Sequence, residues 1–369
     1  MMTKEELDNY FIKETFKLAK KGEYIADPNP MVGAVLVKNN KIISSGYHKG
    51  PGNFHAEYIA IKKAGKHSMG STLYVNLEPC CHFGRTPPCS DYIIKNKIKR
   101  VVISTIDPNP LISGKSIKQL KKNGIEVTVG IFENEAKKIN AGFFTKFNFR
   151  RPYIVAKSAI SLDGKISTVD SKSRWITSKE SRQDVHIERA KCSAILTTSS
   201  TVLADDPKLN VRGKEICKKI NSQPYLVLLD TNLRISNNHL IFKNMKRNII
   251  IFTCKNITSR IINKYKKNVQ LFKVKKSQNG VDLTKTFQIL ADLNIHKLLV
   301  ESGNILISSL LNKSYIDEFI LYVAPKIFGN NAKTFSGINN INKLSDKIEF
   351  DIDDIQHIKS DIKLKLKRK

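Results

Sequence analysis

The sequence HAEYIAIKKAG at residues 55–65, followed by LEPCCHFGRTPPC at 77–89, decides the fold of the first half of the chain. Apolar residues at helical spacing in the first stretch predict a helix that begins at His55. The second stretch follows a short strand-like run, and its Cys89 opens another predicted helix, whose amide dipoles favour a thiolate. These patterns predict that His55, Cys80 and Cys89 meet at one place.

His55, Cys80 and Cys89 are residue types that bind Zn²⁺, and three protein ligands leave the fourth position of a catalytic zinc to water. Coordination lowers the pKa of that water from about 15.7 to about 7. Glu57 lies two residues after His55, and on a helix such residues point roughly 200° apart. We therefore expect Glu57 to move protons and not to bind the metal, a combination typical of zinc-dependent deaminases.

The cysteine spacing leaves an alternative open. Short deaminase signatures place two residues between the cysteines, whereas eight residues separate Cys80 from Cys89 here. A closed structural zinc site with Cys81 or His82 as a fourth ligand would also fit, although Glu57 would then have no task. We interpret Cys81 as a packing residue or a spare thiol, and the intervening residues as the lining of a substrate pocket.

Length and composition indicate a globular chain of two units. Its 369 residues exceed a usual single domain, and the hydrophobic content of 41% is ordinary for a soluble protein. Residues 1–22 predict an amphipathic helix without the apolar block of a signal peptide, and no apolar run is long enough to span a membrane. Six cysteines without a secretory signal indicate a reducing compartment. We therefore expect a cytoplasmic protein with no membrane partner.

The formal net charge of +30 suggests a nucleic-acid partner, and a nucleic-acid base deaminase is the alternative function that this charge and the zinc residues allow. The lysines are, however, scattered through every segment. In residues 360–369 (SDIKLKLKRK) they alternate with Ile362, Leu364 and Leu366, which predicts a last strand with a solvated lysine face. We expect no nucleic-acid partner and an anionic small-molecule substrate, which the positive field would attract.

Alternating helices and strands predict an α/β fold in two domains, 1–148 and 152–369, with Pro152 at the start of a new strand. In the first domain we expect helices near 4–21, 55–65, 89–95, 115–122 and from 133, and strands near 32–38, 41–47, 71–76, 100–104 and 125–129. In the second we expect helices near 178–190 and 304–311, and strands near 153–160, 193–197, 225–229, 248–252 and 297–301. Free amides after Gly303 could hold a phosphate, although no G-x-G-x-x-G is present.

The two domains together resemble the bifunctional riboflavin-biosynthesis deaminase/reductase family over nearly the whole chain. The motifs that carry the resemblance are PNPMVG at 28–33, HAE at 55–57, LEPCCHFGRTPPC at 77–89, DPNP at 107–110, SLDGK at 161–165, WITS at 175–178, TVLADDP at 201–207 with Leu209 and Arg212, and VESG at 300–303. The resemblance implies a cytidine-deaminase-like α/β/α domain followed by a dihydrofolate-reductase-like α/β domain. It also implies zinc-dependent deamination of 2,5-diamino-6-(5-phosphoribosylamino)pyrimidin-4(3H)-one and then NADPH-dependent reduction of the ribosyl chain to ribityl.

Site residues follow from the same resemblance. His55, Cys80 and Cys89 would bind zinc, with Glu57 as the proton shuttle. Contacts to the pyrimidine substrate in the first domain would be Asn29, His48, Arg85, Asp107 and Asn109. Contacts to NADPH would be Ala159, Trp175, Thr201, Asp205, Thr231, Gly303, Asn304, Ile305, Leu306, Ile307, Ser308 and Ser309. Contacts to the substrate of the reductase would be Lys157, Ser173, Arg189, Leu209, Arg212 and Glu301.

The residues alone leave plainer roles open. A lone tryptophan such as Trp175 most often packs in a core, His48 after a strand can cap it or face solvent, and Asp107 between prolines can serve only a turn. Arg189 and Arg212 offer forks for a 5′-phosphate but could be surface charges. A structural zinc and nucleotide-binding protein without catalysis is a third interpretation. We expect the enzyme, with a phosphorylated pyrimidine as partner and a homo-oligomer, dimer or tetramer, as its state.

Overall fold

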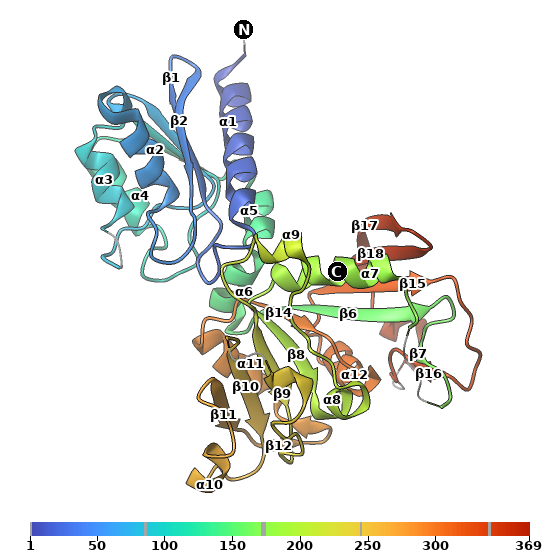
Figure 1. The fold of residues 1–369 in the computed structure, drawn as a ribbon. Coiled ribbons are helices and arrows are strands. Elements are labelled where there is room, and N and C mark those ends of the chain that lie inside the picture. The colour runs from blue at the N-terminus through green and yellow to red at the C-terminus, as the bar shows by residue number, and fades with distance from the viewer. Residues whose placement is uncertain (1, 85–86, 171–174, 244–245, 339–340) are drawn as a thin grey trace. The chain divides into compact units, whose positions relative to one another are not determined.

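The structure, a computed structural model, describes residues 2–84, 87–170, 175–243, 246–338 and 341–369 (Figure 1). The chain divides into two compact units, Met1–Arg150 and Arg151–Lys369. Arg150 ends the last helix of the first unit with a left-handed φ of 50°. Among the described residues, no helix is long and apolar enough to cross a membrane.

The first unit contains a five-stranded sheet of order β2-β1-β3-β4-β5. Its strands are β1 (Gly33–Lys38), β2 (Lys41–Tyr47), β3 (Thr72–Val75), β4 (Arg100–Ile103) and β5 (Glu126–Val129). Strand β1 is antiparallel to both β2 and β3, whereas β3, β4 and β5 are parallel. All five strands lie within or beside the ranges that the sequence predicted.

Helices cover both faces of this sheet. They are α1 (Lys4–Ala19), α2 (Ala56–Ala64), α3 (Cys89–Lys95), α4 (Lys115–Lys122), α5 (Glu133–Ile139) and α6 (Ala141–Phe149), with short 3₁₀ turns at Lys20–Gly22 and Gly65–Ser68. Phe11 and Ile12 of α1 pack on one face, and α2, α3 and α4 pack on the other. One helix was expected from residue 133 to the end of the unit, but the structure has two. The second of these helices, α6, continues to Phe149, one residue past the predicted end of the first domain at 148.

The second unit contains a nine-stranded sheet of order β11-β10-β9-β8-β14-β6-β15-β18-β17. Its strands are β6 (Tyr153–Ser161), β8 (Ala194–Thr198), β9 (Tyr225–Leu229), β10 (Ile249–Thr253), β11 (Val269–Lys273), β14 (Lys297–Val300), β15 (Glu318–Ala324), β17 (Phe350–Ile358) and β18 (Asp361–Arg368). Two small ladders join β12 (Lys276–Ser277) to β13 (Gly280–Val281) and β16 (Lys333–Thr334) to β7 (Lys165–Ser167). The strands from β11 to β15 are parallel, so their carboxyl ends share one edge.

The helices of this unit are α7 (Lys179–Ala190), α8 (Ser199–Asp205), α9 (Lys214–Cys217), α10 (Ser259–Ile262), α11 (Leu283–Asp292) and α12 (Asn304–Asn312), with 3₁₀ turns at Leu240–Phe242 and Leu344–Asp346. Phe287 of α11 and Leu310 of α12 belong to the core on one face of the sheet. Val185 of α7 packs with Val155, Leu299 and Tyr322 on the other. Helices on both faces of each sheet confirm the predicted α/β class.

The last strand differs from its prediction. Lys363 on β18 is only 2% exposed, and its Nζ pairs with Asp184 and, at 2.7 Å, with Glu188, both on α7. Lys365 lies 3.0 Å from the same Glu188 carboxylate. The lysine face of β18 is therefore not solvated, because α7 covers it and supplies the acidic partners. Burial would raise the pKa of Glu188, but Lys191, Lys365 and Lys363 outweigh it and lower that pKa to about 2.

We predict that Lys363→Met destabilises the second unit by about 3 kcal/mol, because it leaves the Glu188 and Asp184 carboxylates without their buried partner. Urea unfolding at pH 7, followed by the fluorescence of the single tryptophan, Trp175, measures this. Lys367→Met is the matched control, since Lys367 lies on the same strand and pairs with the half-exposed Asp353. Equal midpoints for the two variants would contradict the prediction.

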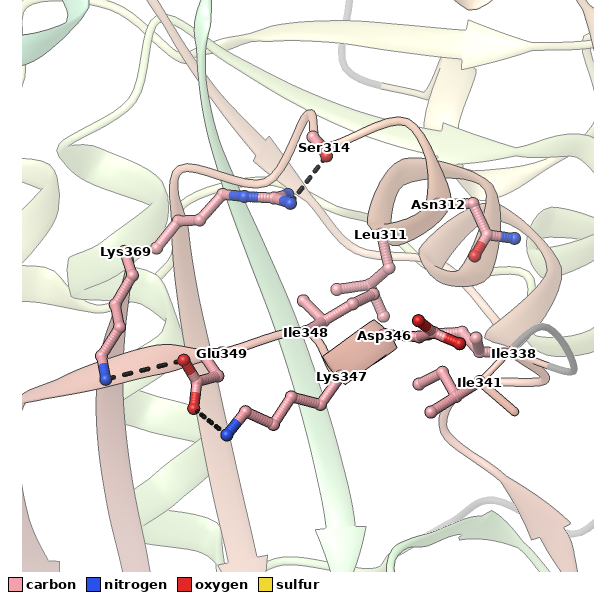
Figure 2. Close-up of a pocket in the computed structure, with 11 residues that line it drawn as sticks. Leu311, Asn312, Ser314, Ile338, Ile341, Asp346, Lys347, Ile348, Glu349 and Lys369 are labelled. Atoms are coloured by element: carbon pink, nitrogen blue, oxygen red, sulfur yellow. Dashed lines mark hydrogen bonds and ion pairs between the residues drawn. The ribbon is translucent and has the colours of Figure 1, made fainter. Parts of the chain in front are cut away.

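A cavity of about 480 Å³ lies beside the carboxyl end of α12 (Figure 2). Its lining includes Leu311, Ile348 and Arg368, and the Arg368 guanidinium donates to Ser314 at 2.6 Å. None of the residues that line it was predicted for either functional site. The cavity is therefore separate from the sites described below.

Candidate zinc centre and reductase site

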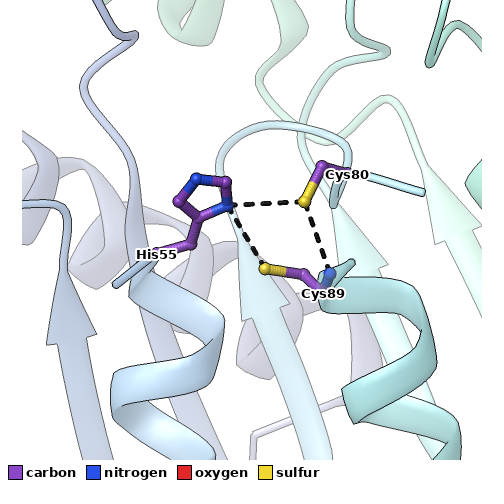
Figure 3. A group of neighbouring side chains, drawn as sticks. All are labelled: His55, Cys80 and Cys89. Carbon is purple, nitrogen blue, oxygen red and sulfur yellow. Dashed lines mark hydrogen bonds between the residues drawn. The ribbon is translucent and has the colours of Figure 1, made fainter. Parts of the chain in front are cut away.

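Three elements bring the predicted metal ligands together (Figure 3). His55 is the N-cap of α2, Cys80 follows β3, and Cys89 is the first residue of α3. The His55 Nδ1 lies 3.4 Å from both cysteine sulfurs, and the Cys89 amide donates to the Cys80 sulfur at 3.3 Å. Cys80 and Cys89 are buried. Segments that are far apart in the sequence thus converge on a small volume.

The three donors fit a zinc ion. Their atoms all lie within 4.8 Å of one another, and ligands roughly 2.3 Å from a tetrahedral metal are roughly 3.8 Å apart. In the described part of the chain, neither Cys81 nor His82 joins this cluster. Cys81 contacts the Leu111 carbonyl at 3.8 Å instead. The arrangement favours a three-ligand site over the closed four-ligand alternative.

Electrostatics in the cluster favour one of the two thiolates that this zinc site requires, since the hydrogen bond to Cys80, burial and Glu57 raise the pKa of Cys89 well above its ordinary value. Hydrogen bonds from Cys89 and then from His55 outweigh burial and lower the pKa of Cys80 to about 4. The hydrogen bond to Cys80 is also the main reason that the pKa of His55 rises to about 9. The two shifts describe an ion pair between a thiolate and an imidazolium, in which a metal cation would replace the proton.

Glu57 lies in the first turn of α2 and is 3% exposed. Burial raises the pKa of its carboxyl group. Its Oε2 has no hydrogen-bond partner among the described residues, which is rare for a buried polar atom. An unsatisfied carboxylate oxygen beside a metal site is the arrangement expected of a group that exchanges protons with a bound water or substrate.

Two predicted substrate contacts lie beside this cluster. The Asn29 amide nitrogen is 2.9 Å from His48 Nε2, and the His48 ring meets the His55 ring edge to face with centroids 5.4 Å apart. His48 is 3% exposed, so the interpretation that it faces solvent was wrong. Burial lowers its pKa, which keeps the imidazole neutral and able to accept or donate a hydrogen bond.

The loop that carries Asp107 and Asn109 is tied to the zinc-bearing segment by a residue that sequence reasoning missed. The buried Glu78, two residues before Cys80, accepts hydrogen bonds from the Asp107 amide at 3.2 Å, the Gly114 amide at 2.9 Å and the Ser116 hydroxyl at 2.8 Å. The Asp107 carboxylate in turn accepts the Asn109 amide at 2.8 Å. Burial raises the pKa of Asp107 to about 7. The only signal for this role in the sequence was the position of Glu78 in the motif EPC, two residues before the zinc ligand Cys80.

We expect Glu78→Gln to raise the KM of deamination about tenfold with zinc content unchanged. The amide nitrogen of glutamine cannot accept, so one buried donor of the loop loses a charged partner, which is worth about 1.5–3 kcal/mol. Steady-state kinetics and metal analysis measure the two effects. Glu135→Gln, on the exposed side of α5, is the control and should keep the wild-type KM. If the KM of Glu78→Gln equals that of Glu135→Gln, the loop does not depend on Glu78.

The Asn29 loop is also clamped from two sides. Asn76, at the end of β3, accepts the Gly33 amide at 2.8 Å and donates to the Met31 carbonyl at 3.0 Å. Asn140, between α5 and α6, bonds both the amide and the carbonyl of Met31, at 2.7 and 3.0 Å. Both asparagines are buried. Neither was predicted, because a buried asparagine carries no signal in the sequence until its partners are known.

In the second unit, the predicted residues Lys157, Arg189 and Glu301 form one buried group. Glu301 follows β14, and its carboxylate receives Arg189 Nε at 2.6 Å, Arg189 Nη2 at 3.0 Å and Lys157 Nζ at 3.1 Å. Burial would raise the pKa of Glu301, but Arg189 and Lys157 outweigh it and hold that pKa well below its usual range. The sequence had suggested that the guanidinium of Arg189 binds a phosphate. In the structure it binds Glu301 and is not open to a phosphate.

Leu209 and Arg212 lie on a segment that docks against α7. Leu209 is buried and has a φ of 45°. The Asn210 carbonyl accepts Arg189 Nη1 at 3.0 Å, and the Arg212 amide lies 3.2 Å from His186 Nδ1. Burial and then Arg189 lower the pKa of His186 to about 4, so its ring is neutral and can accept that amide. The exposed Arg212 side chain bonds Asn210 Oδ1 at 2.8 Å.

Several predicted cofactor contacts meet at the carboxyl edge of the parallel strands, where α/β folds bind ligands. Thr198 at the end of β8 lies 3.1 Å from the Thr201 hydroxyl and 3.1 Å from that of Ser302, which precedes the N-cap of α12 at Gly303. Thr231 follows β9, and Asp205 ends α8. The first turn of α12 thus faces a cluster of hydroxyl groups, which could bind phosphate oxygens.

The other cofactor contacts are distributed along neighbouring elements. Asn304, Ile305, Leu306, Ile307, Ser308 and Ser309 all lie on α12, where Leu306 and Ile307 are buried and Ile305 is 64% exposed. Ala159 lies on β6 opposite Tyr322 of β15. Arg85 and Ser173 lie outside the described residues.

Trp175 is 61% exposed, so the alternative that it packs in a core was wrong. The Arg182 guanidinium lies 4.1 Å from the centroid of its ring. Lys326 Nζ donates to the carbonyls of Trp175 and Ile176 at 3.1 and 2.6 Å. Arg182 of α7 thus contacts the ring and Lys326 fixes the backbone that carries it, which suits a platform for a planar ligand.

Comparisons with known proteins agree with this geometry. Residues 5–105 match the family described as the cytidine and deoxycytidylate deaminase zinc-binding region, and residues 152–364 match the RibD C-terminal domain. The riboflavin biosynthesis protein RibD of Aquifex aeolicus is 43% identical over 324 residues, which cover 88% of both chains.

Solved structures show the same similarity. RibD of Acinetobacter baumannii (form 2) has a TM-score of 0.90 and 34% identity over 100% of both chains. The diaminohydroxyphosphoribosylaminopyrimidine deaminase/5-amino-6-(5-phosphoribosylamino)uracil reductase of Thermotoga maritima has a TM-score of 0.85 and 35% identity, over 98% of this chain and 99% of that one. These matches and the histidine–cysteine cluster confirm the two cofactors that the sequence implied, zinc and NADPH. The chain therefore belongs to the RibD family of bifunctional riboflavin-biosynthesis enzymes, with a zinc-binding deaminase domain followed by a reductase domain.

Proposed function

We propose that residues 1–148 deaminate 2,5-diamino-6-(5-phosphoribosylamino)pyrimidin-4(3H)-one to 5-amino-6-(5-phosphoribosylamino)uracil, and that residues 152–369 then reduce the ribosyl chain to ribityl with NADPH. Two observations carry this proposal: a three-donor metal cluster in the first unit lies beside Glu57, whose Oε2 has no hydrogen-bond partner among the described residues, and a Lys157–Glu301–Arg189 group lies in the second.

In the deaminase, His55, Cys80 and Cys89 would hold zinc, which supplies a Lewis acid that makes water a nucleophile near neutral pH. The buried Glu57 carboxylate would take a proton from the attacking water and deliver it to the departing amino group, which leaves as ammonia. Asn29, His48, Asp107 and Asn109 would orient the pyrimidine and its sugar arm, together with Arg85. A positioned glutamate is typically worth about 10²- to 10⁴-fold in rate.

In the reductase, the hydride comes from the cofactor, and the protein aligns donor and acceptor. NADPH would lie along the carboxyl edge of the sheet against Ala159, Trp175, Thr201, Asp205, Thr231 and residues 303–309. Lys157 and Glu301, which are joined at 3.1 Å, would contact the sugar chain, and Arg212 would contact its phosphate. Leu209 and Ser173 complete the substrate contacts that we propose, and Arg189 holds the Glu301 carboxylate in place.

The test is incubation of the purified chain with the diaminopyrimidine phosphate, with and without NADPH, followed by mass analysis. We expect ammonia and the aminouracil without NADPH, and the ribityl product with it. Deamination of tRNA or single-stranded DNA, with steeply salt-dependent binding, would favour the nucleic-acid deaminase instead. Retained zinc without ammonia release would indicate an inert structural site.

We also propose a homo-oligomer, dimer or tetramer, in the cytoplasm. Strand β17 is an edge of the nine-stranded sheet, and its Ile352 and Ile355 are 64% and 54% exposed. An edge strand leaves backbone groups unpaired, and the two exposed isoleucines of β17 add apolar surface, so this edge can pair with a second copy. Six free cysteines support a reducing compartment. Light scattering after gel filtration tests the oligomer, and a monomer at micromolar concentration would contradict it.

A further inference from the structure

Arg247 is an arginine that the proposed reaction does not use, and it is 1% exposed. Its Nε, Nη1 and Nη2 donate to the carbonyls of Pro224, Lys208 and Tyr225 at 2.9, 3.3 and 3.4 Å. Among the described residues, no carboxylate forms an ion pair with it. Burying a charge without a countercharge costs free energy. We therefore expect Arg247 to have a role that offsets this cost.

The position of Arg247 indicates such a role, because it binds the backbone of the segment that carries Arg212. Its Nη1 holds the Lys208 carbonyl, and Arg189 holds the Asn210 carbonyl two residues later. Two guanidinium groups thus fix the backbone that presents Arg212. Burial and then the charge of Arg189 lower the pKa of Arg247 to about 9, whereas Glu301 opposes this shift. Arg247 therefore experiences the charges of the proposed substrate site although it is itself covered.

The charges around this segment are unbalanced. Four cationic side chains, Lys157, Arg189, Arg212 and Arg247, share the single carboxylate of Glu301, which Lys157 and Arg189 already engage. In the described part of the chain, neither Arg212 nor Arg247 has an acidic partner. A site with this surplus of fixed positive charge attracts a dianion and disfavours its neutral analogue.

We propose that Arg247 is a positioning residue for the 5′-phosphate of the substrate of the reductase: it fixes residues 208–212, which present Arg212, and supplies a buried positive charge that the phosphate neutralises. The proposal rests on the proposed reductase function. Arg247 makes no contact with the substrate. Arg212 contacts the phosphate, because the guanidinium of Arg189 is occupied by Glu301. The site therefore takes a phosphomonoester and discriminates against the unphosphorylated riboside.

The test compares Arg247→Gln, which removes the charge, with Arg247→Lys, which keeps it, in the full-length holoenzyme. We expect Arg247→Gln to raise the KM for the phosphorylated substrate about tenfold or more, with kcat and the KM for NADPH changed less than about threefold. Arg247→Lys should recover most of that loss. Arg260→Gln, an exposed arginine of the same unit, is the control and should match the wild type.

A second measurement uses inorganic phosphate alone as the probe. Phosphate should raise the Tm of the wild type and of Arg247→Lys, but raise that of Arg247→Gln much less. Should Arg247→Gln not fold, Arg247→Met, which keeps an apolar stem in the buried space, replaces it.

The inference would be overturned by an unchanged substrate KM in the charge-free variants, by an equal rise in the KM values for substrate and NADPH, or by a loss in Arg247→Lys equal to that in Arg247→Gln. Failure of every charge-free variant to fold, with Arg247→Lys folded, would show a structural role and overturn it too. Absence of NADPH-dependent reduction in the wild type would instead refute the proposed function, so the two failures are distinguishable.

Discussion

Replacing Glu57 with glutamine should slow ammonia release strongly while leaving the zinc in place. Among the residues that the structure describes, the buried Glu57 Oε2 has no hydrogen-bond partner, and burial raises the pKa of this carboxyl group, as suits a group that takes and returns a proton. Glutamine keeps the shape and removes that ability. We expect deamination to slow by at least about 10²- to 10⁴-fold, with bound zinc within error of the wild type by metal analysis.

The same variant also tests the independence of the two domains. Reduction of the already deaminated aminouracil by NADPH should proceed at the wild-type rate, because Lys157 and Glu301 belong to the second unit. Glu14→Gln, whose carboxylate pairs with the exposed Lys17 on the same helix, is the control for a charge change in the first unit. Loss of both reactions in Glu57→Gln would make separate sites untenable, and loss of zinc would make Glu57 a ligand.

The sequence predicted regular elements well where local chemistry marks their ends. Helices α3 and α4 begin at Cys89 and Lys115, as expected, since Pro88 and Gly114 precede them. Strand β15, which lies between β6 and β18 in the interior of the sheet, was not predicted. Its run EFILYVA is apolar and carries no alternation, and such a run does not by itself distinguish a buried strand from a buried helix.

Features that depend on contacts distant in sequence could not be predicted. Alternation in the tail correctly indicated a strand, but which face of it is buried depends on the carboxylates that α7 supplies to Lys363. Similarly, the guanidinium of Arg189 suggested a phosphate site, whereas 112 residues of sequence separate it from its partner Glu301. Motifs identified the residues of the sites, and the tertiary contacts decide which of them remain available to a ligand.

Replacing Glu301 with glutamine should have the largest effect on the second domain. The carboxylate is buried between Arg189 at 2.6 Å and Lys157 at 3.1 Å, and its loss leaves two cations without a countercharge. Removing one partner of a buried ion pair costs about 3–5 kcal/mol. We expect the free energy of unfolding of this domain to fall by about 3 kcal/mol and NADPH-dependent reduction to fall at least about 100-fold, while deamination continues. Glu215→Gln, at an exposed acid, is the control.

The effect of pH distinguishes a charge effect from a packing effect. Because Arg189 and Lys157 hold the pKa of Glu301 below its usual range, its charge contributes stability that is fully present above the unfolded pKa of about 4.3 and is lost as pH falls through the lower folded pKa. The stability difference between wild type and Glu301→Gln should therefore be complete at pH 7 and smaller at pH 3. Urea unfolding monitored by Trp175 fluorescence at both pH values measures it. A difference that does not change with pH would mean that glutamine disturbs packing alone, and that the buried ion group does not hold Arg189 and Lys157 through charge.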